Sequence, residues 1–120
     1  MSIYINEESI LHIETLIVGL PEHINQLREI KYNNQSINEQ LETLKQHHII
    51  GSSVGKISST MFYTNNQPKR LLTVGLGNLK DLSYQRLLKV WGHTFQFLKQ
   101  EHINEAEVLL DTFISVSYTH

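Results

Sequence analysis

The sequence predicts an α/β domain in which a mixed β-sheet is flanked by helices. Leu71 to Leu76 is an apolar run typical of a buried strand, and it enters a glycine-opened loop, Gly75 to Asn78. A long amphipathic segment from Ser83 to Gln100 follows directly. Along the chain the predicted order is strand, helical stretch, hairpin, long helix and strand. Helices packed on a mixed sheet bury all of these apolar faces.

Length and composition indicate one globular domain over residues 1–120. Hydrophobic residues make up 40% of the chain and charged residues 18%, a balance that argues against disorder. The net charge of −2 provides no basic surface for nucleic acid, and no apolar run approaches the roughly 20 residues of a membrane helix. Because cysteine and a secretory signal are also absent, the sequence predicts a cytoplasmic protein with neither nucleic-acid nor membrane partners.

Two strands are expected near the N-terminus. Ile3 to Ile5 is predicted to be a short edge strand, and Ile10 to Val18 becomes continuously apolar, as a strand entering a covered sheet does. Gly19 to Pro21 is expected to end that strand. Pro21 also suits the first turn of a short helix, whose apolar stripe would comprise Ile24, Leu27 and Ile30.

A loop and a helix come next. Lys31 to Gln35 contains two adjacent asparagines and is predicted to be a loop. Ser36 and Glu39 have the spacing of a capping box, in which each side chain accepts a hydrogen bond from the other residue's backbone N–H. The following helix is expected to extend to Gln46, with one apolar face formed by Ile37, Leu41 and Leu44.

The middle of the chain predicts an antiparallel hairpin. Gly51 and Gly55 interrupt the helical pattern, and Lys56 to Tyr63 is rich in β-branched and aromatic residues. Thr64 to Pro68 has turn chemistry, and Leu71 to Leu76 forms the second strand.

The helix from Ser83 to Gln100 is the clearest element in the sequence. Its apolar face is predicted to contain Tyr84, Leu87, Leu88, Trp91, Phe95 and Leu98. Phe97 lies off this stripe, where it could meet a neighbouring surface. Trp91 and Phe95 are predicted to be core residues, because aromatic side chains dominate core energetics. A last buried strand is expected within Ala106 to Ile114.

Gly75, Gly77 and Asn78 form the one loop in which a ligand could be expected. Backbone N–H groups in such a loop can hold phosphate. A dinucleotide fingerprint, however, requires a third glycine where Lys80 stands, and the Gly-Lys-Ser/Thr of a Walker loop is absent. The two glycines are therefore predicted to permit a tight turn, with Gly75, Gly77 and Asn78 kept as the cofactor-loop candidate.

No other pattern predicts catalytic or metal-binding residues. His47 and His48 are adjacent and diverge by about 100° on a helix, His93 and His102 are far apart, and His12 could pair only with Glu14. No further ligand is spaced to complete a metal site. Five further carboxylates are expected to be solvated at element ends: Glu7, Glu8, Glu101, Glu105 and Glu107.

Taken together, these segments resemble the N-terminal domain of the leucine aminopeptidases, the cytosol aminopeptidase family. Leu71 to Asn78, the helix after it, and Val108 to Leu110 are similar to that domain. Thr15 to Leu20 resembles its first main strand, and Ile50 to Lys56 resembles its Gly-Lys-containing connection. The resemblance covers most of the chain, from Leu11 to Ile114.

The resemblance implies a macro-domain-like fold and a non-catalytic role in assembly and positioning. In this family a separate C-terminal domain holds two divalent metal ions, of the Zn or Mn type, and removes N-terminal amino acids from peptides. The resemblance thus implies that domain as a partner and a homo-oligomer for the full-length protein. The family's Asn-Thr-Asp-Ala-Glu-Gly-Arg segment is absent from this sequence, so no catalytic or metal residue is carried over. The chain is expected to be shortened at its C-terminus.

Two alternatives remain open from the sequence. The first is a macro-domain-like module that binds ADP-ribose or a related nucleotide at the loop Gly75 to Asn78. The second is a small protein-interaction domain whose contact surface includes Phe97 or the Trp91 face of the long helix.

Overall fold

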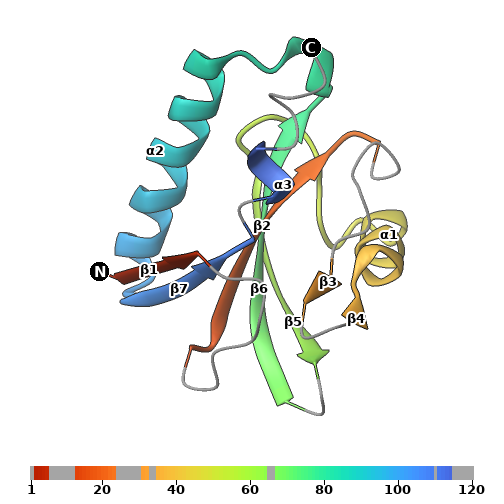
Figure 1. The fold of residues 1–120 in the computed structure, drawn as a ribbon, viewed down its shortest axis with the longest axis vertical. Helices are drawn as coiled ribbons and strands as arrows, with labels where there is room; N and C mark the ends of the chain where they lie inside the picture. Colours follow the sequence, from red (N-terminus) through yellow and green to blue (C-terminus); the bar gives the residue numbers. More distant parts are fainter. Residues whose placement is uncertain are drawn as a thin grey trace.

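The computed structural model describes residues 2–5, 13–23, 31–32, 35–64, 67–109 and 111–114. A five-stranded sheet has the order β1 (Ser2–Ile5), β7 (Glu105–Val108), β2 (Thr15–Pro21), β6 (Gln67–Gly77) and β5 (Ile57–Thr64). The strands β1, β7, β2 and β6 run parallel, and β5 is antiparallel to β6. In Figure 1 the sheet lies between the long helix α2 on one side and the helix α1 on the other. The predicted α/β class with a mixed, helix-flanked sheet is confirmed.

The strand β2, Thr15–Pro21, lies in the middle of the sheet. All seven of its residues are buried, since parallel strands covered on both faces carry continuous apolar runs. It starts later than predicted, because Ile13 and Glu14 precede the strand. Residues 10–12 of the predicted strand lie outside the described part of the chain.

The predicted strand break at Gly19 to Pro21 is wrong, because β2 continues through Pro21. Gly19 donates its N–H to Thr112 Oγ1 at 2.8 Å, on the side of the strand away from β6. By alternation the Pro21 nitrogen faces that same side, where β7 has already ended, so the missing N–H interrupts no ladder. The short helix predicted over Ile24 to Ile30 lies outside the described residues.

The predicted hairpin is confirmed and is tighter than expected. The strands β5, Ile57–Thr64, and β6, Gln67–Gly77, pair from Ile57 opposite Val74 to Thr64 opposite Gln67. Thr64, Gln67 and Pro68 therefore belong to strands and not to the predicted turn. Pro68 is tolerated because it lies one residue from the strand start.

Helix α1, Asn38–Gln46, begins one residue later than a capping box requires. Ser36 belongs instead to a small antiparallel pair, β3 (Lys31–Tyr32) with β4 (Gln35–Ser36), so the predicted loop is partly a strand pair. The N-cap is Ile37, and no side chain caps the helix there. The predicted apolar face is confirmed, since Ile37 and Leu41 are buried and Leu44 packs against the core.

Helix α2, Tyr84–Gln100, is confirmed, and its buried face is rotated from the predicted one. Val90, Thr94 and Leu98 are buried, and Leu87, Trp91 and Phe97 pack partly buried against the core. Tyr84, Leu88 and Phe95 are exposed by 75%, 53% and 41%. Small Val90 and Thr94 side chains let the helix approach the sheet, and Thr94 can be buried because its hydroxyl donates to the Val90 carbonyl.

The last predicted strand is shorter than expected. The strand β7 covers only Glu105–Val108, and the helical turn α3, Asp111–Ile114, replaces its second half. Leu109 donates its N–H to the Ile17 carbonyl, and Thr112 donates its N–H to the Leu109 carbonyl. The apolar residues Leu109 and Phe113 are buried in this turn. A short apolar run can be buried either as a strand or as a helical turn, so the sequence pattern alone does not distinguish the two. The predicted edge strand is confirmed as β1, Ser2–Ile5.

Candidate functional site

The loop predicted as a ligand site lies at the carboxyl edge of the sheet, where β2 and β6 end together. Pro21 is the register partner of Gly77, and Glu22 donates its N–H to the Gly77 carbonyl at 2.9 Å. Lys45 of α1 donates to the Glu22 carbonyl at the same edge. In open α/β sheets this is the edge at which ligands bind.

The backbone donors of this loop bond to the chain itself. Gly75 donates its N–H to the Lys56 carbonyl at 2.8 Å, and Gly77 donates to the Ser52 carbonyl at 2.7 Å. Asn78 caps the short 3₁₀ turn η2, Leu79–Asp81, by accepting from the Lys80 N–H at 3.0 Å. The groups that would hold a phosphate therefore already bond to the 52–56 segment and to η2.

The shapes of the two glycines fit this packing. A Cβ atom added at Gly75 would lie 1.9 Å from the Ser53 carbonyl oxygen, which is backbone and cannot rotate away. Gly77 has φ +66°, a conformation that favours glycine, and an added Cβ would lie 2.5 Å from Val54 Cγ2. A nucleotide could reach these donors only after the 52–56 segment had moved.

The described histidines do not gather into a site. Four of the candidates are exposed on α1, on α2 or just after them: His47, His48, His93 and His102. Within the described ranges, no three His, Asp or Glu side chains come together as metal ligands. His12 lies outside those ranges, so its pairing with Glu14 stays a prediction.

One carboxylate contradicts the expectation of solvated charge. Glu101 and Glu105 are exposed as predicted, whereas Glu107 in β7 is fully buried. Residues 7 and 8 lie outside the described part of the chain. The predicted strand starts at Ala106, which places Glu107 next to a strand end, whereas β7 starts at Glu105 and buries Glu107.

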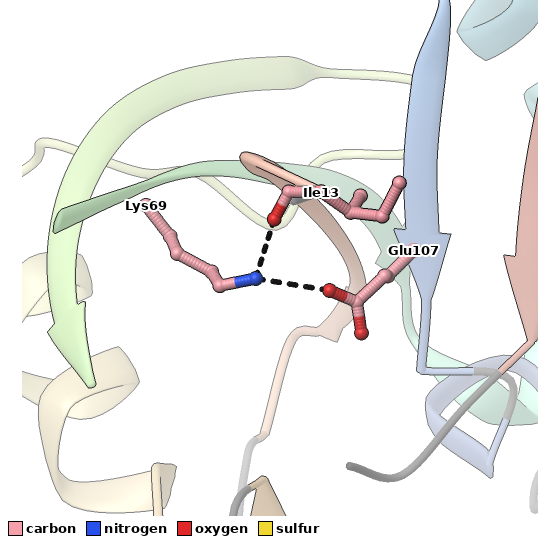
Figure 2. A network of polar contacts seen from close by, with 3 residues as sticks. All are labelled: Ile13, Lys69 and Glu107. Carbon is pink, nitrogen blue, oxygen red and sulfur yellow. Dashed lines mark hydrogen bonds and ion pairs between the residues drawn. The ribbon is translucent and has the colours of Figure 1, made fainter. Parts of the chain in front are cut away.

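Glu107 forms a buried ion pair with Lys69 of β6. The Lys69 Nζ atom lies 3.0 Å from Glu107 Oε1, and the side chains are only 2% and 0% exposed. Lys69 also donates to the Ile13 carbonyl, as Figure 2 shows. Since β2 lies between β6 and β7, the pair crosses the central strand on one face of the sheet.

A weak sequence signal for this pair exists. Lys69 lies two residues before Leu71 in β6, so both side chains point to the same covered face. Glu107 lies between Ala106 and Val108, both fully buried or nearly so. Opposite charges at covered positions of two strands indicate a buried pair, because an isolated buried charge is too costly.

Trp91 and Phe95 differ in their surroundings. Trp91 packs on Phe113 of α3 with ring centroids 4.7 Å apart, which confirms it as a core contact. Phe95 stacks on Trp91 at 5.5 Å but is 41% exposed, so its assignment to the core is wrong. Phe97 is half-buried beneath Arg70, whose guanidinium lies 6.0 Å from the ring centroid. The part of the chain that the structure describes contains no helix long and apolar enough to cross a membrane.

Comparison with known proteins identifies relatives over almost the whole chain. Residues 17–119 match the sequence profile of the "Cytosol aminopeptidase family, N-terminal domain". The chain is 28% identical over 104 residues to the "Probable cytosol aminopeptidase" of Bacillus subtilis and 24% identical over 102 residues to the protein of the same name from Bacillus licheniformis. These alignments cover 87% and 85% of this chain and 21% of each relative. The chain thus spans about a fifth of the length of the curated relatives it matches.

Proposed function

The chain belongs to the cytosol aminopeptidase family as an N-terminal domain, and from this membership we propose that it is the non-catalytic assembly and positioning domain of a larger peptidase. The observation that carries the proposal is the profile match over residues 17–119, in a chain that spans about a fifth of its relatives' length. The larger part of those relatives has no counterpart in this sequence, and we assign the peptidase chemistry to it.

The proposed parent enzyme removes N-terminal amino acids from peptides with two divalent metal ions, of the Zn or Mn type. Such ions activate a water molecule and polarise the scissile carbonyl. The described residues of this chain do not fit a two-metal centre, because they bring no three His, Asp or Glu side chains together. We therefore place the metals in a C-terminal catalytic domain, which is the first partner of this chain.

The proposed role of this chain is to present a rigid body to the rest of the enzyme. The buried Lys69–Glu107 pair fixes β6 and β7 about β2, and the 52–56 segment closes the carboxyl edge through Gly75 and Gly77. Exposed aromatic side chains on α2 provide contact area: Tyr84 and Phe95. We further infer a cytoplasmic homo-oligomer that binds neither nucleic acid nor membrane.

Deletion in the full-length protein tests this role. The complete reading frame and a version without residues 1–120 are purified, and their masses are compared by light scattering. Metal content per chain and kcat/KM on a leucyl peptide are measured on both. We expect the deleted protein to bind the metal ions at the same stoichiometry while its assembly is smaller. Unchanged mass and unchanged kcat/KM after deletion would contradict an assembly and positioning role.

A further inference from the structure

The strand β5 is an outer strand of the described sheet. It pairs only with β6, along all eight residues from Ile57 to Thr64. The other outer strand, β1, has four residues. An outer strand offers a row of backbone donors and acceptors to any extended segment that lies beside it.

Alternation in the hairpin determines which β5 residues face outward. Gly75 donates its N–H to the Lys56 carbonyl, so the even-numbered residues Ser58, Thr60 and Phe62 bond to β6. The backbone groups of the odd-numbered residues then point away from β6: Ile57, Ser59, Met61 and Tyr63. Among the residues that the structure describes, none hydrogen-bonds to these outward groups.

The side chains of β5 do not protect this edge. Natural outer strands are usually blunted by charge, proline, a bulge or shortness. Residues Ile57–Thr64 contain neither a charged residue nor a proline, and the pairing with β6 is regular throughout. Met61 and Tyr63 are exposed by 54% and 67%, and they lie on the same face of the strand.

Open space borders β5 on both faces of the sheet. A hollow of about 240 Å³ between the strand and α2 is lined by Ile57 and Phe97 among others. A second hollow, of about 370 Å³, lies between the strand and α1, against Met61 and Phe62. Neither helix therefore fills the space beside the outer strand.

We propose that β5 is a dimerisation edge, at which a second copy of this chain adds its own β5 antiparallel across a two-fold axis. With Met61 opposite Met61 of the second copy, Ser59 of one copy faces Tyr63 of the other. This register pairs outward-facing residues with outward-facing residues, so all of the hydrogen bonds along the new ladder can form. The two sheets become one continuous sheet.

Charge favours self-association of two copies through β5 over self-association through α2. Pairing β5 with itself brings no charged residue of the strand against another. Arg70, the register partner of Met61 on β6, already bonds to Ser59 Oγ and pairs with Glu101. Helix α2 carries cations at Arg86, Lys89 and Lys99 and no acid, so two such helices would repel each other.

The β5 edge provides a contact surface for the assembly role proposed above. The biological purpose of the dimer rests on that proposed role, whereas the pairing itself does not. Sedimentation velocity of the 120-residue chain tests the pairing over a range of concentrations. We expect the mass to rise from 13.9 kDa towards twice that value as concentration increases. Met61→Lys places a charge at the two-fold axis, and Met61→Pro removes an outward N–H without touching the ladder to β6. Both variants should remain monomeric while they keep the parent far-UV circular dichroism spectrum.

Leu88→Lys is the matched control, because Leu88 is 53% exposed and lies on α2. This variant should dimerise like the parent. A parent chain that stays monomeric at every concentration overturns the proposal, and so does a dimer that Leu88→Lys abolishes and the Met61 variants keep. Either result leaves the assembly role to be decided by the deletion experiment, so the two proposals fail separately.

Discussion

Lys69 Nζ and Glu107 Oε1 lie 3.0 Å apart, on strands that are separated by the whole width of β2. The two charges lie 38 positions apart in the sequence and come together only when the parallel part of the sheet has formed. Both side chains are almost entirely inaccessible to water, so each charge compensates the other across this contact.

Glu107→Gln should strongly destabilise the fold. The substitution removes the carboxylate that lies 3.0 Å from the buried Lys69 ammonium, and breaking a buried ion pair typically costs about 3–5 kcal/mol. Urea unfolding followed by circular dichroism gives the change in the free energy of unfolding. The double variant Lys69→Met with Glu107→Leu should be more stable than Glu107→Gln, because it buries no charge. A double variant no more stable than Glu107→Gln would contradict the ion-pair explanation.

Thr112→Val should destabilise through the backbone of β2. The Thr112 hydroxyl accepts from the Gly19 N–H at 2.8 Å and donates to the Leu109 carbonyl at 2.7 Å. Valine leaves that buried N–H unpaired, at a cost of about 1–3 kcal/mol in the free energy of unfolding. Thr43→Val is the control, since its hydroxyl bonds to the Glu39 carbonyl at an exposed position, and a change within about 0.5 kcal/mol is expected. Equal losses of stability at Thr112 and Thr43 would contradict the view that the Thr112 hydroxyl stabilises β2 through the buried Gly19 N–H.

Two glycine-to-alanine substitutions should change the free energy of unfolding in opposite directions. At Gly75 the new Cβ would lie 1.9 Å from the Ser53 carbonyl oxygen, so Gly75→Ala should destabilise by about 1–3 kcal/mol or more. At Gly92, in the middle of α2, no atom beyond the adjacent residues and the backbone of the helix itself lies within 4 Å of the new Cβ. Gly92→Ala should therefore stabilise by about 0.5–1 kcal/mol through helix propensity alone. Thermal unfolding of both variants measures the two changes in stability. If Gly75→Ala were as stable as the parent, the 52–56 segment would have to move aside at little cost, which would contradict the tight packing at Gly75.

Two serine substitutions distinguish a real helix cap from a predicted one. Ser83 Oγ accepts from the Arg86 N–H at 3.2 Å at the start of α2, so Ser83→Ala should cost about 1 kcal/mol. Ser36 is exposed and caps nothing, so Ser36→Ala should change the free energy of unfolding by less than about 0.5 kcal/mol. A larger loss of stability for Ser36→Ala than for Ser83→Ala would show that Ser36 caps α1 as the sequence predicts.

Elements with strong local signals were predictable from the sequence, and their contacts were not. Helix α2 follows from its 3.6-residue periodicity, and the β5–β6 hairpin follows from two apolar runs around a turn. The buried face of α2 was misplaced because large residues such as Tyr84 and Leu88 were assigned inward. The residues of α2 that are buried against the sheet include the smaller Val90 and Thr94, which permit close approach of the helix to the sheet. That choice depends on the surface of β6, which no local pattern encodes.

The same limit applies to the candidate site. The position of Gly75 and Gly77 at the carboxyl edge follows from the strand that precedes them, whereas their bonds to Lys56 and Ser52 depend on a segment about 20 residues away along the chain. The Lys69–Glu107 pair was missed for a related reason. Each residue alone resembles a solvated charge at a strand end, and only the strand order brings the two together.

The hydrolytic activity of the purified 120-residue chain tests the central claim most directly. The chain is incubated with a leucyl peptide and Zn²⁺ or Mn²⁺, and free leucine is measured beside the full-length protein at the same molar concentration. The account predicts release of leucine by the full-length protein only, with the chain alone equal to the buffer blank. Metal-dependent release of leucine by the folded chain alone, surviving repeated purification, would contradict a non-catalytic N-terminal domain.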